Sequence, residues 1–208
     1  MSARKGRFIT FEGVDGAGKS TQLALAEKLL KDRGVASIVT REPGGTAIGE
    51  KLRELLLNGT DAPLAETEAL LMFAARREHI DKVIRPALSR AETVLCDRFT
   101  DATFAYQGGG SGVDTAKLEI LERWVQGNLQ PDLTLYFDVS TVVARARLGD
   151  LRVADRFERE PDAYFERVRQ AYLDRARAHP ERIKVIDASA DATEVNKTVK
   201  DILLSICL

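Results

Sequence analysis

The strongest indication of the fold is the segment Phe8-Ile-Thr-Phe-Glu-Gly-Val-Asp-Gly-Ala-Gly-Lys-Ser-Thr21. It opens with a short β-rich run, turns through a glycine-rich segment, and continues with apolar residues at helical spacing until Gly34. Within it, residues 13–20 match the pattern G-x-x-x-x-G-K-[ST] at every fixed position. The pattern predicts a strand, a phosphate-binding loop and a helix, in that order.

The loop has the chemistry of a nucleoside triphosphate site. Glycines let consecutive backbone N–H groups curl around a phosphate, and the following helix adds unpaired N–H groups and its positive dipole end. We expect Lys19 to reach the β- and γ-phosphates and the Ser20 hydroxyl to hold Mg²⁺. The residues predicted to bind ATP in this segment are Gly13, Val14, Asp15, Gly16, Ala17, Gly18, Lys19, Ser20 and Thr21.

Strands and helices alternate along the rest of the chain. Further strands are predicted at 35–40, 93–96, 133–137 and 183–186, and helices at 47–57, 66–89 (crossed by Pro86), 114–127 and 192–205, with one more after the fourth strand. Apolar strands joined by helices indicate a parallel sheet covered on both faces. We therefore expect one domain, 1–208, with a three-layer α/β/α P-loop fold and a five-stranded parallel sheet. The glycine cluster at 108–112 is expected to be a short flexible stretch.

Composition limits the partners. Among 208 residues, 31 Lys and Arg oppose 32 Asp and Glu, so the net charge of −1 gives no overall attraction for nucleic acid or an acidic membrane. Cys96 and Cys207 are far apart and indicate neither a disulfide framework nor a zinc site. No apolar run approaches the roughly 18 residues of a membrane span, and no signal peptide is recognised, so we expect a cytoplasmic protein.

Two predicted strands end in an aspartate that could orient Mg²⁺. These are Asp97 and Asp138, and we favour Asp97 because Arg98 places positive charge at the same strand end. An aspartate that only caps the next segment remains the simpler interpretation of Asp138.

A phosphate loop is compatible with a GTPase, a transporter-type ATPase or a small-molecule kinase. The sequence contains neither the guanine-binding motif N-K-x-D of GTPases nor the L-S-G-G-Q signature of transporter ATPases. A kinase must hold two polyanions with arginines from several parts of the chain, and the sequence supplies such arginines. Three of these, Arg76, Arg145 and Arg159, are expected to be ordinary surface arginines. The arginine-rich segment at about 145–158 is predicted to be a mobile lid over the nucleotide.

The sequence motifs resemble the thymidylate kinases within the nucleoside monophosphate kinase family, over essentially the whole chain. The resemblance is carried by Phe11-Glu-Gly-Val-Asp-Gly-Ala-Gly-Lys-Ser-Thr21, Arg41-Glu-Pro-Gly-Gly-Thr46, Asp97-Arg98-Phe99, Ala105-Tyr-Gln-Gly-Gly-Gly110 and Pro131-Asp-Leu-Thr-Leu135. It implies transfer of the γ-phosphoryl of ATP, with Mg²⁺, to dTMP, giving dTDP and ADP for dTTP biosynthesis, and a homodimer built through helix packing.

The resemblance also implies roles for single residues. Asp15 would contact the sugar 3′-hydroxyl, and Arg53 and Arg98 would hold the acceptor phosphate. Phe73, which its place in the apolar stripe Met72-Phe73-Ala74 would otherwise predict to be a core residue, would stack on thymine. Arg77, one helical turn later, would reach a base carbonyl. The remaining residues expected to bind dTMP are Thr103 at the base edge, Tyr106 against C2′ of the sugar, and Gln107.

Some members of the family carry an arginine inside the phosphate loop, which this chain lacks, since its variable positions are Val14, Asp15, Gly16 and Ala17. By resemblance to the other members, an arginine of the lid, from Arg147, Arg152 and Arg156, would bridge the phosphates. Arg152 is favoured for that role and Arg147 for stacking on adenine. The predicted catalytic residues are therefore Asp15, Lys19, Arg98 and Arg152, and the predicted metal ligands are Ser20 and Asp97.

Other functions remain open at this point. They are another (deoxy)nucleoside monophosphate kinase, a deoxynucleoside kinase and a non-catalytic P-loop ATP sensor. These alternatives differ in the acceptor that would stimulate ADP release from ATP.

Overall fold

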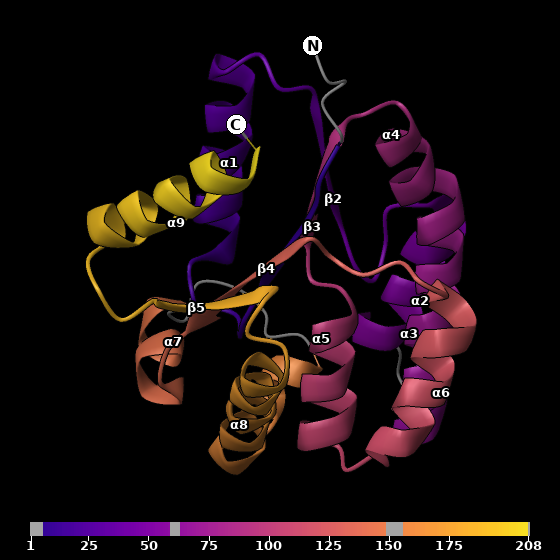
Figure 1. Ribbon diagram of the computed structural model, residues 1–208. Coiled ribbons are helices and arrows are strands. Elements are labelled where there is room, and N and C mark those ends of the chain that lie inside the picture. Colours follow the sequence, from indigo (N-terminus) through magenta and orange to yellow (C-terminus); the bar gives the residue numbers. More distant parts are fainter. Residues whose placement is uncertain (1–5, 59–62, 149–155, 208) are drawn as a thin grey trace.

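The computed structural model describes residues 6–58, 63–148 and 156–207, and within them five parallel strands form one sheet (Figure 1). In chain order the strands are β1 (Phe8–Glu12), β2 (Ser37–Arg41), β3 (Thr93–Asp97), β4 (Leu133–Asp138) and β5 (Ile183–Asp187). Their spatial order is β2-β3-β1-β4-β5. The three central strands are almost fully buried, whereas the edge strands β2 and β5 are partly exposed. The predicted five-stranded parallel sheet is confirmed.

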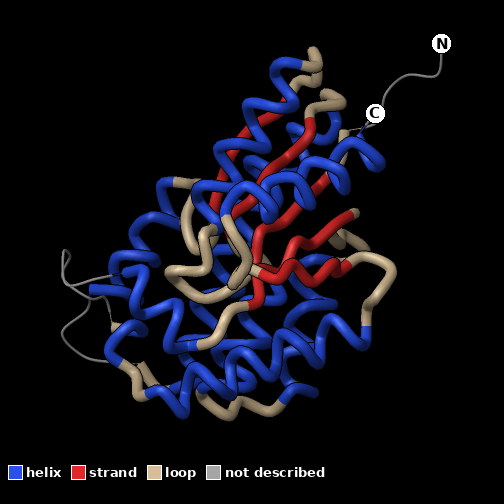
Figure 2. Tube along the Cα trace, turned by 90° about the vertical axis from the view of Figure 1, so that its left-hand side faces the viewer, coloured by secondary structure: helices blue, strands red, loops and turns tan. Residues whose placement is uncertain are grey.

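Helices cover both faces of this sheet, as predicted for three layers. Figure 1 shows α1 (Lys19–Asp32) and α9 (Ala192–Cys207) on one face, and Figure 2 shows the twisted strands enclosed between helices. The other helices are α2 (Ala47–Asn58), α3 (Ala65–His79), α4 (Arg85–Ser89), α5 (Thr100–Thr103), α6 (Thr115–Gln126), α7 (Thr141–Leu148) and α8 (Asp162–Ala178), with a 3₁₀ turn η3 (Phe157–Arg159). In the described segments no helix combines the length and apolarity that a bilayer crossing requires.

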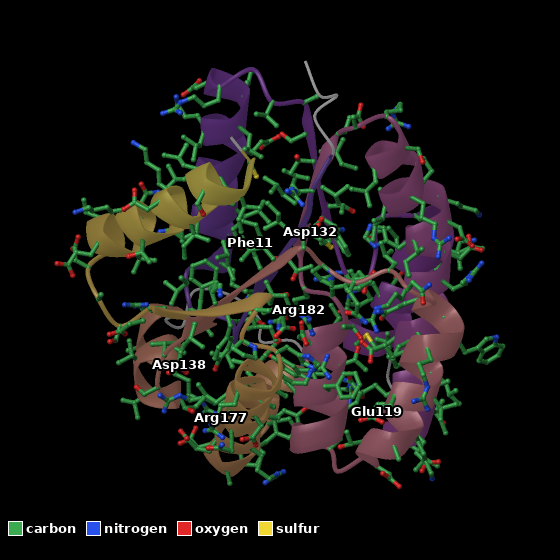
Figure 3. All side chains as sticks on the ribbon, viewed as in Figure 1. Phe11, Glu119, Asp132, Asp138, Arg177 and Arg182 are labelled. Carbon is green, nitrogen blue, oxygen red and sulfur yellow. The ribbon has the colours of Figure 1, made fainter. Side chains whose placement is uncertain are left out.

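Side chains sort by their position between these layers. Phe11 of β1 is fully buried and stacks on Phe137 of β4, with ring centroids 6.1 Å apart. Glu119 and Arg177 lie on the outer sides of α6 and α8 and point away from the sheet (Figure 3). Charged side chains such as these lie on the outside, whereas apolar side chains are buried between the layers, and this burial is the main stabilising contribution to the fold.

The predicted long helix at 66–89 is one continuous helical segment with a change of winding. After α3 the chain makes a π-helical turn, η1 (Ile80–Ile84), before α4 begins at Arg85. Pro86 lies in the first turn of α4. The proline is accommodated because the segment is not a uniform α-helix at this point.

The prediction of a flexible glycine stretch at 108–112 is wrong for its first half. Gly108, Gly109 and Gly110 belong to a π-helical segment, η2 (Phe104–Gly110), that continues α5 and packs on α8. A Cβ on Gly109 would lie 2.6 Å from the Cβ of Ala171, and one on Gly110 would lie 2.5 Å from the Tyr164 ring. These glycines therefore serve close helix packing rather than flexibility.

A buried carboxylate joins three elements at the carboxyl edge of the sheet. Glu12, the last residue of β1, accepts hydrogen bonds from the Phe99 backbone N–H (2.7 Å) and the Tyr172 hydroxyl of α8 (2.8 Å). Burial, with a smaller repulsion from Asp101, raises the pKa of Glu12 to about 8, against the opposing effects of Arg98 and the two hydrogen bonds. The same residue thus links the phosphate loop to the segment after β3 and to the helix after the predicted lid.

The raised pKa of Glu12 predicts a pH-dependent stability. Folded Glu12 keeps its proton up to about pH 8, whereas the unfolded chain releases it near 4.5, so the folded state binds more protons in between. The contribution of Glu12 to the free energy of unfolding should fall by roughly 2–5 kcal/mol as the pH rises through this window. Urea unfolding of wild type and Glu12→Gln from pH 5 to 9 measures it. The difference between the two proteins should change with pH; parallel profiles would contradict the assignment.

Candidate active site

The phosphate loop lies between β1 and α1, as predicted. Gly13, Gly16 and Gly18 all adopt positive φ, and a Cβ on Gly16 would lie 2.2 Å from the backbone oxygen of Ala144, so no other residue fits there. No side chain caps the N-terminus of the 14-residue helix α1, which leaves its first N–H groups available to an anion. Ser20 and Thr21 lie exposed in its first turn.

Lys19 is held against this loop. Its buried Nζ donates to the backbone oxygen of Val14 (2.9 Å) and to Asp15 Oδ1 (3.3 Å). Burial lowers the pKa of Lys19, and the positive charge of Arg98 acts in the same direction. The ammonium group therefore lies in the loop beside a second cation, an arrangement that an incoming polyphosphate would stabilise.

Asp15 connects the loop to the segment after β3. Arg98 donates from one terminal nitrogen to Asp15 Oδ1 at 3.0 Å. Burial alone would raise the pKa of Asp15, but Arg98 and Lys19 outweigh it and hold the carboxyl well below its ordinary value. Arg98 has a φ of 65° and stacks over the Tyr106 ring at 4.9 Å, and its other terminal nitrogen is buried without a hydrogen-bond partner in the described structure.

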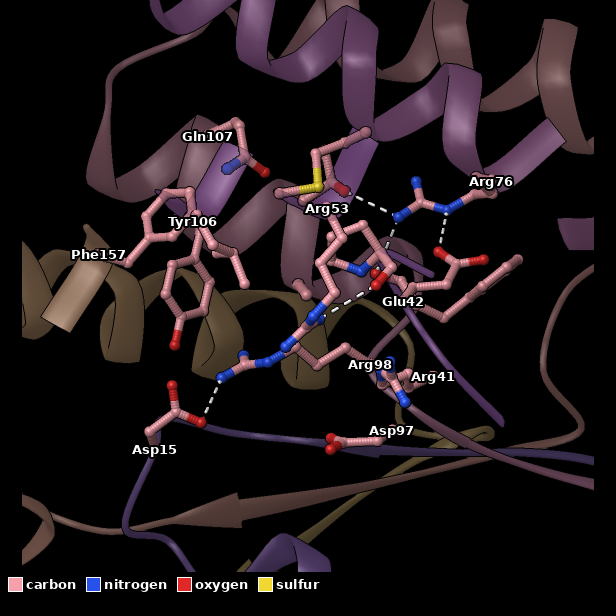
Figure 4. A pocket seen from close by; sticks show the side chains of 16 residues that line it. Asp15, Arg41, Glu42, Arg53, Arg76, Asp97, Arg98, Tyr106, Gln107 and Phe157 are labelled. Atoms are coloured by element: carbon pink, nitrogen blue, oxygen red, sulfur yellow. Dashed lines mark hydrogen bonds and ion pairs between the residues drawn. The ribbon is translucent and has the colours of Figure 1, made fainter. Parts of the chain in front are cut away.

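A pocket opens directly beside this ion pair (Figure 4). The residues that line it come from the phosphate loop, from the ends of β2 and β3 with the segments that follow them, and from the helices α2, α3, η2 and η3. The lining residues are Asp15, Arg41, Glu42, Pro43, Arg53, Leu57, Met72, Arg76, Asp97, Arg98, Phe99, Ala102, Thr103, Tyr106, Gln107 and Phe157. The lining combines arginines and carboxylates with aliphatic and aromatic side chains.

Six residues predicted to contact the acceptor meet in this pocket, namely Asp15, Arg53, Arg98, Thr103, Tyr106 and Gln107. Arg53 of α2 donates to the backbone oxygen of Pro43 (3.1 Å), and Gln107 donates to the buried Glu68 (2.6 Å). The Tyr106 hydroxyl is buried and has no hydrogen-bond partner within the described residues. The predicted set therefore converges from elements far apart in the chain.

Phe73 and Arg77, the predicted base-binding pair, lie outside the pocket and require a correction. Phe73 is 1% exposed in the apolar core between α3 and the sheet, and Arg77 is 53% exposed, paired with Asp81 and donating to the backbone oxygen of Val125. Residues one position earlier, Met72 and Arg76, line the pocket instead. Both pairs are spaced one helical turn apart, so helical spacing by itself does not distinguish them.

Arg76 is not the surface arginine that the sequence led us to expect. It is 2% exposed and donates to Glu42 Oε2 (2.7 Å), the backbone oxygen of Phe99 (3.1 Å) and Thr103 Oγ1 (2.9 Å). One terminal nitrogen, Nη1, is buried without a partner among the described residues. A buried guanidinium with an unused donor beside a pocket is well placed to bind a polar ligand atom.

Asp97 is better suited than Asp138 to hold a metal ion, because the two carboxylates differ in their hydrogen bonding. Asp97 lines the pocket, and its Oδ1 is buried with no hydrogen-bond partner in the part of the chain described. Asp138 accepts two hydrogen bonds from Arg169, at 2.7 and 2.9 Å, and is therefore already paired. An unpartnered carboxylate oxygen at the carboxyl edge of the sheet suits Mg²⁺, which prefers oxygen ligands.

The arginines of the predicted lid are only partly described. Arg152 lies outside the described residues. Arg147 of α7 donates to the backbone oxygen of Ala188 (2.7 Å), while Arg156 pairs with Glu68 of α3 and donates to the backbone oxygen of Leu56 (3.0 Å). Arg145 pairs with Asp162 at the surface, as expected.

Sequence reasoning missed part of the pocket wall. Met72, Arg76 and Leu57 were not predicted, and neither were Arg41, Glu42 and Pro43 of the motif Arg41-Glu-Pro-Gly-Gly-Thr46. The motif itself was the available signal, since it lies at the carboxyl end of β2 on the same sheet edge as Asp97. The site thus brings an anion-binding loop, an unpartnered carboxylate and two partly unsatisfied arginines around one pocket, which suits alignment of two phosphate-bearing molecules.

Comparison with known proteins agrees with this geometry. The family model described as thymidylate kinase matches residues 11–199. A thymidylate kinase of Nitrosomonas eutropha is 60% identical over 200 residues, covering 96% of this chain and 93% of the relative. One of Nitrosospira multiformis is 59% identical over 202 residues, covering 97% of this chain and 98% of the relative.

Among solved structures, the crystal structure of thymidylate kinase from Ehrlichia chaffeensis superposes with a TM-score of 0.77 at 37% identity. The match covers 96% of this chain and 99% of that one. Sequence motifs, fold and comparisons therefore agree along nearly the whole length, and the chain belongs to the thymidylate kinase family.

Proposed function

We propose that this chain transfers the γ-phosphoryl group of ATP to dTMP, giving dTDP and ADP as a cytoplasmic step of dTTP biosynthesis. The observation that carries the proposal is the Asp15–Arg98 ion pair, which joins the phosphate loop to the wall of the neighbouring pocket. A donor triphosphate on the loop and an acceptor in the pocket would meet at this pair. The family membership supports the same acceptor.

The pocket wall suggests how dTMP would lie. Arg53 and Arg98 would hold its 5′-phosphate and Asp15 its 3′-hydroxyl, and Tyr106 would pack against C2′ and disfavour a ribose. At the other end, we assign the base contacts to Met72 and Arg76 in place of Phe73 and Arg77. Met72 supplies an adaptable apolar surface for the ring. The unused donor of Arg76, with Thr103 beside it, would be left unsatisfied by a base without a matching acceptor.

The reaction needs alignment and charge neutralisation more than a base, because an acceptor phosphate is already ionised at neutral pH. Lys19 and the N–H groups of α1 would bind the donor phosphates, and Arg98 would bring the acceptor oxygen in line. Mg²⁺, when bound by Ser20 and Asp97, would neutralise charge on the donor phosphates. Arg152 remains our candidate for bridging the two phosphates and Arg147 for the adenine.

The acceptor is tested by ADP release from ATP with a panel of nucleosides and nucleoside monophosphates. We expect dTMP to give the highest kcat/KM and unphosphorylated nucleosides to give no release. Lys19→Met, which removes a charge from the donor site, should lower kcat by at least about 100-fold. Preference for another monophosphate, release with nucleosides only, or no release with any acceptor would replace this proposal by the corresponding alternative.

The assignment of the base contacts predicts opposite behaviour for adjacent arginines. Arg76→Gln should raise the KM for dTMP by about 10–100-fold, because a charged donor facing the base is lost. Arg77→Gln should leave that KM within about twofold, since its partners are the exposed Asp81 and the backbone oxygen of Val125, neither of which lines the pocket. Steady-state kinetics at saturating ATP measures both. The reverse result would return the base contact to Arg77.

We also propose a homodimer formed by the outer faces of α3 and α6. Leu70, Ile120 and Trp124 are 53%, 57% and 77% exposed on these helices, and a groove between them is lined by further apolar residues. Exposed apolar residues gathered on neighbouring helices are typical of an association surface. A second copy of the same helix pair would cover them.

Trp124 makes the dimer measurable, because it is the one tryptophan of the sequence. Its fluorescence emission should shift to longer wavelength on dilution as the indole returns to water. Trp124→Glu should sediment as a monomer, whereas Val142→Glu, at an equally exposed apolar site on α7, should sediment like wild type. A monomeric wild type at all concentrations would contradict the proposal.

A further inference from the structure

A buried histidine lies directly behind Arg76 without touching the pocket. His79, the last residue of α3, is 0% exposed and is not among the residues that line the pocket. Its Nδ1 lies 2.8 Å from Glu42 Oε1, and its Nε2 lies 2.7 Å from the Thr40 hydroxyl of β2. Both ring nitrogens are therefore engaged, which fixes the plane of the ring.

Glu42 connects this histidine to the arginine. One carboxylate oxygen of Glu42 faces His79, and the other accepts from Arg76 Nε at 2.7 Å. A carboxylate paired with a guanidinium has no hydrogen to give, so His79 Nδ1 is the donor of its bond. A hydrogen-bonded series therefore leads from the edge strand β2 to the pocket wall, through Thr40, His79, Glu42 and Arg76. Each side chain in it restricts the orientation of the next.

His79 also supports the backbone of the segment that carries Glu42. Gly45 has a φ of 75°, and a Cβ there would lie 2.7 Å from His79 Cδ2, so the backbone packs directly on the imidazole. Pro43, in the same segment, accepts a hydrogen bond from Arg53. Removal of the ring would therefore loosen the backbone beside Glu42, the residue through which Arg76 is oriented.

We infer that His79 is a positioning residue for the acceptor nucleotide: through Glu42 it orients Arg76 toward the base, although it touches neither substrate. The inference rests on the proposed function for the identity of the acceptor. The buried carboxylate would otherwise have one oxygen without a partner and could rotate, carrying the guanidinium with it. The donor site lies on the phosphate loop, where Lys19 donates to Val14 and Asp15 rather than to any of these four residues.

The test compares His79→Leu with His79→Asn. Asparagine places its Nδ2 two bonds from Cβ, as histidine places Nδ1, so it keeps a donor for Glu42, whereas leucine keeps only apolar volume. We expect His79→Leu to raise the KM for dTMP on the order of tenfold, with the KM for ATP and kcat within about twofold. His79→Asn should restore most of the dTMP KM. Thermal unfolding and calorimetric binding of dTMP accompany the kinetics, so that a loss of folded protein is recognised.

The link through Arg76 is tested by a double-mutant cycle. In an Arg76→Gln background, His79→Leu should raise the dTMP KM by less than about twofold, because the group that it orients is already gone. A further tenfold rise, an equal rise in the KM for ATP, or an asparagine variant no better than leucine would overturn the inference. If wild type prefers another monophosphate, the proposed function fails while the same comparisons, made with that acceptor, still decide the role of His79.

Discussion

The pairing of β1 with β3 is the interaction on which the site depends. It sets Phe11 opposite Asp97, and the backbone oxygen of Phe11 accepts the N–H of Arg98 at 3.0 Å. Because both strands end at the same edge, the phosphate loop leaves one strand where Asp97 and Arg98 leave the other. Glu12 then secures the neighbouring Phe99 N–H, and the Asp15–Arg98 pair forms between two segments more than 80 residues apart.

Although the net charge is nearly zero, several charged side chains are buried beside the pocket in defined ion pairs. Arg76, Arg98 and Lys19 are buried or nearly so, and each has a carboxylate partner in Glu42 or Asp15. Burying such charges is unfavourable unless partners and hydrogen bonds compensate. At the pocket this compensation is incomplete, because one N–H donor each of Arg76 and Arg98 and one oxygen of Asp97 have no hydrogen-bond partner in the described structure. A ligand that completes these bonds would be bound selectively.

Features that depend on residues close in the sequence could be predicted, whereas features that depend on distant residues could not. The phosphate loop lies between strand and helix as predicted, because its glycines act through local backbone geometry. Asp97 lies at a strand end as predicted, and its role as a metal ligand stays a prediction. On α3 the pocket is lined by the residues one position before the predicted pair. Met72 and Arg76 share the spacing of Phe73 and Arg77, and only the rotation of α3 against the sheet decides which pair is turned to the pocket. The predicted flexibility of the glycines at 108–110 is wrong because their packing partner, α8, lies some 60 residues later in the sequence.

The sequence by itself determined the parallel α/β architecture, the phosphate loop and the resemblance that pointed to the family. These depend on periodicity and on short motifs, in which neighbouring residues act together. Three features became visible only in the packed chain: Arg76 rather than Arg77 lines the pocket, Asp97 keeps an oxygen without a partner among the described residues whereas Asp138 pairs with Arg169, and His79 lies behind Glu42. These features depend on which faces of distant elements meet, and that is set by packing of the whole chain.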